Sequence, residues 1–83
     1  MKKSVSDLRS IVFNGGSIII NVQDYTVTDI KGIVFTAKHK SAKVYLKGAI
    51  NLTTNDCRSI AFSAGSDANV IFDFTDWLMM FFC

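Results

Sequence analysis

One ten-residue pattern occurs three times in this chain of 83 residues, and it restricts the possible fold more than any other feature. Each copy has a hydroxyl residue, an aspartate three positions later, an apolar residue, a base, a small residue, an isoleucine, a small apolar residue and a phenylalanine. The copies occupy residues 4–13, 26–35 and 53–62. Recurrence at this spacing predicts a chain built from similar structural units.

The start of each copy predicts the first turn of a helix. A hydroxyl group at the N-cap accepts a hydrogen bond from a free backbone amide, and a carboxylate at the third helical position can bond back. Apolar residues at positions i, i+3 and i+4 then form one buried face. The predicted cap pairs are Ser4 with Asp7, Thr26 with Asp29, and Thr53 with Asp56. The predicted buried faces are Leu8, Ile11 and Val12; Ile30, Ile33 and Val34; and Cys57, Ile60 and Ala61.

A strand-like run follows each predicted helix, at 17–22, 43–47 and 69–74. Alternation along these runs turns every second side chain toward the helices. The inward positions are Ile18, Val44 and Val70 in one row, and Ile20, Leu46 and Phe72 in the next. Helices and strands in series favour parallel strands joined by right-handed crossovers.

The predicted fold class is therefore α/β, with one domain over residues 1–83. Three helix–strand repeats, at about 4–22, 26–47 and 53–74, would form a small three-stranded parallel sheet with the helices on one face. This arrangement resembles the leucine-rich-repeat family of short α/β solenoids. The resemblance implies an architecture and no activity, because the leucine spacing and the strand asparagine of that family are absent here.

The end of the chain repeats the start of the pattern without a strand after it. Residues 75–82 are predicted to form a C-terminal capping helix that is apolar almost all round. Such a helix can pack across the end of the core, or it can contact a second copy of the chain. The residues expected at an oligomer contact are Trp77, Leu78, Met79 and Phe82.

Composition restricts the class of protein. Hydrophobic residues make up 49% of the chain and charged residues 19%, which is typical of a globular domain. No apolar stretch is long enough to cross a bilayer, and no sorting signal is evident, so no membrane partner is expected. The expected location is the cytoplasm of a bacterium or of a phage-infected host. The single histidine and two separated cysteines predict no metal site and no cofactor.

The uncovered face of the predicted sheet is the candidate binding surface. Its outward side chains form an apolar row with a central tyrosine, flanked by polar and charged groups, which is typical of a protein-binding patch. The candidate residues are Ile19, Asn21, Lys43, Tyr45, Lys47, Ile71 and Asp73. Parallel sheets are normally covered on both faces. The alternative to a different partner is therefore that the capping helix covers this face, or that a second copy of the chain covers it in a homodimer.

Residues 31–50 contain five lysines and no acid, which suggests nucleic acid as an alternative partner. Lys38 and Lys40 are the candidate phosphate contacts, supported by Lys43 and Lys47. Only Tyr45 is identified as a stacking aromatic near them, so the alternation of bases and aromatics found in single-strand binders is not predicted. Protein is therefore preferred to nucleic acid as the partner.

No catalytic residues are predicted, and the chain is not expected to be an enzyme. The recurring aspartates are explained as helix caps, and the lone His39 has no partner to orient it. A small cofactor-free domain of this kind resembles phage inhibitor proteins, such as anti-CRISPRs, and toxin-immunity proteins in size and style. The predicted function is a protein-binding inhibitor that blocks a partner surface. The alternatives are a nucleic-acid-binding accessory protein and a structural homo-oligomer.

Overall fold

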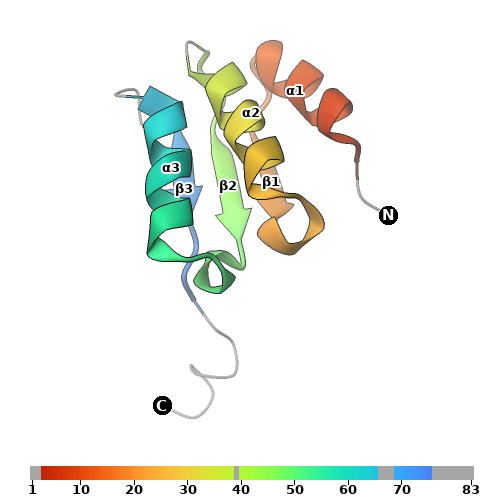
Figure 1. Ribbon diagram of the computed structural model, residues 1–83. Coiled ribbons are helices and arrows are strands. Elements are labelled where there is room, and N and C mark those ends of the chain that lie inside the picture. The colour runs from red at the N-terminus through yellow and green to blue at the C-terminus, as the bar shows by residue number, and fades with distance from the viewer. Residues whose placement is uncertain (1–2, 39, 66–68, 76–83) are drawn as a thin grey trace.

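The computed structural model describes residues 3–38, 40–65 and 69–75. Helices and strands alternate along the chain, and each of the first two strands runs into a short 3-10 turn. The elements are α1 (Val5–Phe13), β1 (Ile18–Asn21), η1 (Val22–Asp24), α2 (Val27–Ala37), β2 (Val44–Lys47), η2 (Ala49–Asn51), α3 (Thr54–Ala64) and β3 (Val70–Phe72). Figure 1 shows the three helices side by side over one face of a small sheet. The chain is therefore a two-layer α/β structure, as predicted.

Each helix begins at the hydroxyl residue that the sequence pattern places there. The side-chain oxygens of Ser4, Thr26 and Thr53 each accept a hydrogen bond, 3.1 Å long, from the backbone N–H three residues later. Those amides belong to the recurring aspartates, whose charge also suits a helix N-terminus. The three predicted N-caps are confirmed.

The first helix ends in a glycine turn. Gly15 has a φ of +93°, in the left-handed region that side chains disfavour. Its N–H donates to the carbonyl of Val12 at 2.9 Å, and the N–H of Gly16 donates to the carbonyl of Ile11 at 3.0 Å. These two bonds form a Schellman motif, which satisfies the last carbonyls of α1 and turns the chain into β1.

The sheet has the order β1-β2-β3, and both pairs of strands are parallel. Its register aligns Ile18, Val44 and Val70 in one row and Ile20, Leu46 and Phe72 in another. These are the two predicted inward rows, and the central strand contributes the most deeply buried members, Val44 and Leu46. The register prediction is confirmed, although the strands are shorter than the predicted runs.

The three helices are not equally covered. α2 lies between α1 and α3, and its predicted face of Ile30, Ile33 and Val34 is completely buried. The prediction is wrong at one position in each outer helix, because Ile11 in α1 is 39% exposed and Ala61 in α3 is exposed. Among the described elements, each outer helix has a helical neighbour on one side only, so the edge of its apolar face stays exposed (Figure 1).

An asparagine ties the second helix to the third strand. The side-chain amide of Asn69 donates to the backbone carbonyls of Ala37, at 2.9 Å, and of Lys40, at 3.1 Å. The Ala37 carbonyl lies at the C-terminal end of α2, where the helix provides no further donors, and the Lys40 carbonyl lies in the loop that follows. This contact fixes the start of β3 beside the loop that precedes β2.

Two further predictions concern the C-terminal capping helix and the absence of a membrane-spanning helix. Apart from Thr75, the predicted capping helix at 75–82 lies outside the described residues. Within the described ranges, no helix is long and apolar enough to cross a membrane.

Candidate functional site

The open face of the sheet carries the predicted apolar row. The register places Ile19 beside Tyr45 and Tyr45 beside Ile71, one residue from each strand. Ile19 is 68% exposed and Ile71 is 42% exposed, while Tyr45 is half-buried between them. Because neighbouring side chains on a sheet face lie about 5 Å apart, these three form a continuous strip.

Tyr45 is held in place by a carboxylate at the end of the third strand. Its phenol O–H donates to Asp73 Oδ2 at 3.1 Å. The other oxygen, Asp73 Oδ1, accepts bonds from the backbone N–H and the hydroxyl of Thr75. Both carboxylate oxygens are therefore engaged, and the tyrosine ring has a fixed direction on the face.

These contacts shift the pKa values of both groups. Hydrogen bonds from the side chain and the backbone of Thr75 lower the pKa of Asp73. Desolvation opposes this shift, while the hydrogen bond from the Tyr45 hydroxyl and the charge of Lys47 lower the pKa further. The hydrogen bond to Asp73 raises the pKa of Tyr45, as do the negative charge of Asp73 and desolvation. The arrangement thus favours a neutral phenol beside an ionised carboxylate at neutral pH.

Neutralising the carboxylate should release the tyrosine. In Asp73→Asn we expect the pKa of Tyr45 to fall toward its ordinary value of 10.0. The stability that its raised pKa contributes is present below the unfolded-state pKa and is lost as the pH rises through the folded-state pKa. The variant should therefore lose less stability above about pH 10 than the parent.

Tyrosinate absorbance would measure this titration in a Tyr25→Phe background, which removes the other tyrosine. Adding Tyr45→Phe to that background is the control and should abolish the signal. An unchanged titration in Asp73→Asn would show that the carboxylate does not control the phenol.

The polar candidates of this face have different surroundings. Lys47 and Asn21 are aligned in the register, and both are exposed. The Asn21 side chain accepts a hydrogen bond from the N–H of Gln23 at 2.9 Å and caps η1, so its oxygen already has a local partner. Lys43 is exposed next to the start of β2, where alternation places it on the same side as Tyr45. The sheet face thus has basic groups along one strand and a carboxylate on the next.

The two candidate phosphate contacts lie elsewhere. Lys40 Nζ is 4.2 Å from the ring centroid of Phe13, at the end of α1, and Lys38 Nζ is 5.7 Å from that of Phe35, in α2. These are side chains of the helical layer. The basic stretch 38–47 therefore does not form one patch, because its two halves belong to different layers.

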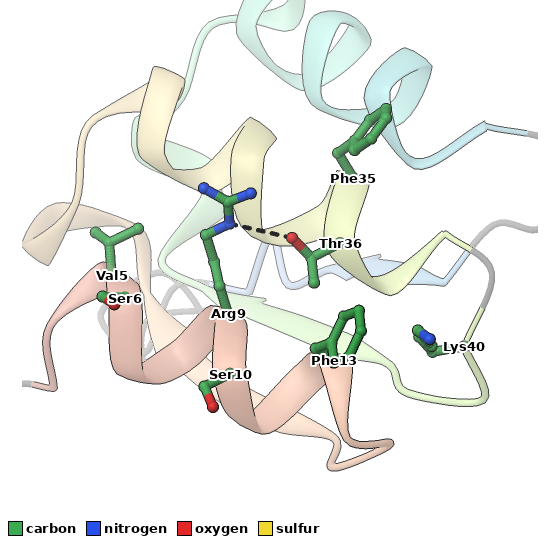
Figure 2. A pocket seen from close by; sticks show the side chains of 8 residues that line it. All are labelled: Val5, Ser6, Arg9, Ser10, Phe13, Phe35, Thr36 and Lys40. Atoms are coloured by element: carbon green, nitrogen blue, oxygen red, sulfur yellow. Dashed lines mark hydrogen bonds between the residues drawn. The ribbon is translucent and has the colours of Figure 1, made fainter.

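A second exposed surface was missed by the sequence reasoning. The phenylalanine that ends each copy of the pattern points away from the core, since Phe13 and Phe35 are each 60% exposed and Phe62 is 87% exposed. The signal was present in the helical spacing: each ring follows the last residue of the predicted buried face by one position, about 100° further around the helix. Figure 2 shows Phe13 and Phe35 beside a groove between α1 and α2.

Other predicted features are not placed. The oligomer contacts Trp77, Leu78, Met79 and Phe82 and the loop residue His39 lie outside the described residues. Among residues 3–38, 40–65 and 69–75, no group of three or more histidine, cysteine or acidic side chains could hold a metal ion. Comparison with protein-family models, with curated proteins and with solved structures found no match to this chain.

Proposed function

We propose that this chain is a non-enzymatic protein-binding module, a small inhibitor that covers a surface of its partner with the open face of its sheet. The observation that carries the proposal is the outward row Ile19–Tyr45–Ile71, in which the two isoleucines are exposed and the half-buried tyrosine donates a hydrogen bond to Asp73. Among the described elements, all three helices lie on the other face of this sheet (Figure 1), whereas parallel sheets are normally covered on both sides. A partner protein would complete that cover.

The composition of the face supports a protein partner. Tyrosine is enriched among the residues that dominate interface energetics, and a ring that is already oriented loses less conformational entropy on binding. Exposed Lys43 and Lys47 flank the apolar row and would form a polar rim. Their charge would favour a partner surface with acidic groups around an apolar centre.

We also propose that the chain is a set of three helix–strand repeats, and a short solenoid in architecture. Two observations support it: the N-cap hydrogen bonds have the same length in all three helices, and the strands pair in chain order without a shift of register. In such an array each unit contacts its neighbours, and the outward row of the sheet becomes one extended surface.

The test is capture of a partner by the immobilised protein. Tyr45→Ala should weaken capture at least tenfold, because truncating an interface hot spot costs about 2 kcal/mol or more. Ile50→Ala is the matched control, since Ile50 is an exposed apolar residue in η2 that is not part of the sheet row. Circular dichroism would verify that both variants fold.

Equal loss of capture in the two variants, or no loss in either, would contradict the choice of face. Light scattering of the free protein tests whether a second copy of the chain covers this face of the sheet instead. A dimer that Ile19→Lys converts to a monomer would assign the face to a second copy of the chain. A dimer that survives this change but is lost on truncation before Trp77 would instead favour the predicted C-terminal contact.

A further inference from the structure

Three open grooves lie on the outer surface of the helical layer, and the charged side chains that line them are all basic. The first, with a volume of about 820 Å³, is lined by Arg9 and Lys40 together with serine, threonine and phenylalanine side chains. The other two lie along α2 and α3. Their basic residues are Lys31 and Arg58 in one, and Lys38 and Arg58 in the other.

Aromatic rings alternate with these basic side chains. Phe13 and Phe35 line the first groove, and Phe35 and Phe62 line the groove between α2 and α3. No aspartate lines any of these three grooves, and the recurring aspartates lie in the first turns of the three helices. The helical layer therefore combines recurring positive charge with recurring, exposed, flat apolar rings.

The basic side chains are positioned by their surroundings. Arg9 Nε donates to Thr36 Oγ1 at 3.1 Å, which draws the guanidinium from α1 across to α2 (Figure 2). Lys40 lies over the Phe13 ring, with its ammonium 4.2 Å from the centroid. The Arg9 guanidinium is therefore held by a hydrogen bond and the Lys40 ammonium by a ring, and their remaining N–H donors can contact a ligand.

We propose that this outer face of the helical layer binds single-stranded nucleic acid. A ligand that matches the surface must repeat an anionic group and a planar apolar group, and a single strand repeats both in every nucleotide. Phosphates would contact Arg9, Lys38 and Arg58. The nucleobases would stack on Phe13, Phe35 and Phe62, without sequence preference because every nucleobase has a π-face.

The strand must be single, because a duplex hides its bases inside the stack and leaves the rings without a partner. An acidic peptide would satisfy the cations but does not carry a planar group at each residue. The proposed surface lies on the layer opposite the open sheet face, and it does not depend on the protein-binding proposal.

The first test is fluorescence anisotropy with a labelled oligothymidylate of about 15 nucleotides at low salt. Phe62→Ala should weaken binding roughly tenfold, because a stacked base contributes about 1–3 kcal/mol. The matched control is Phe74→Ala, at an exposed phenylalanine that follows β3 and does not line the grooves. It should leave the affinity unchanged.

A second pair of variants tests the phosphate contacts. Binding should weaken as salt rises, and Lys38→Gln should reduce the slope of log K against log salt by about 0.7, the value for one phosphate on a single strand. Lys43→Gln removes the same charge from the sheet side and should leave the slope as it is. A fall of the slope in both variants, or in neither, would overturn the assignment of the surface.

Two further ligands separate nucleic acid from other polyanions. A duplex of the same length and polyglutamate of matched charge should each bind at least several-fold more weakly than the single strand. If either binds equally well, or if Phe62→Ala leaves oligothymidylate binding intact, stacking makes no contribution and the proposal is wrong. Absence of binding to the oligonucleotide at low salt would also overturn it.

Discussion

Replacing Leu46 by alanine should remove about 2–5 kcal/mol from the free energy of unfolding. Leu46 lies on the central strand and is completely buried beneath the helices. Its truncation leaves a cavity where strands on both sides restrict relaxation of the backbone. A chain of this length has a total stability of roughly 4–12 kcal/mol, so a large share would be lost. Urea denaturation followed by circular dichroism would measure the change.

Ile19→Ala provides the matched control for this prediction. It shortens an aliphatic side chain of the same sheet on the exposed face, so it should change the stability by about 0.5 kcal/mol or less. If the two variants were equally stable, β2 would not be the centre of the core. A changed slope of the urea transition would instead point to an altered unfolded state.

Removing all three helix caps at once should cost about 3 kcal/mol. Each of Ser4, Thr26 and Thr53 satisfies one backbone N–H, and the loss of one such cap typically costs about 1 kcal/mol. The caps belong to different helices and share no partner, so the three effects should add. Thermal and urea unfolding of the triple alanine variant would test the sum.

Two single substitutions make this prediction sharper. Thr53→Ser keeps a hydroxyl acceptor at the cap and should retain nearly full stability, whereas Thr53→Ala should lose about 1 kcal/mol. Thr28→Ala is a further control, because Thr28 is an exposed threonine inside α2 and is not a cap. If Thr28→Ala and Thr53→Ala cost the same, the cap hydrogen bond contributes nothing.

Much of the fold could be predicted because its determinants are local. A hydroxyl three residues before an aspartate caps a helix by itself, and alternating apolar residues fix which face of a strand is buried. The alignment of Ile18, Val44 and Val70 followed from these local rules once the strands were assumed to be parallel. The outward row Ile19–Tyr45–Ile71 followed from the same alignment.

The remaining features depend on contacts between distant residues. The sequence shows no sign that Ile11 would face solvent, because its exposure depends on α1 having, among the described elements, a neighbouring helix on one side only. The Asn69 amide reaches two carbonyls near the end of α2, about 30 residues earlier in the chain. The ring of Phe13 contacts Lys40, from the loop after α2, and the ring of Phe35 contacts Lys38, at the end of α2. The alternation of aromatic rings with basic side chains therefore arises only in three dimensions.

The strand order β1-β2-β3 has a consequence for how the protein reaches its native state. Since each strand pairs with the next one along the chain, the paired residues are about one helix and one strand apart, as with Ile20 and Leu46. The loops that must close are short for a parallel sheet, which favours rapid folding. Stopped-flow refolding would show whether the rate exceeds that of parallel sheets with a rearranged strand order.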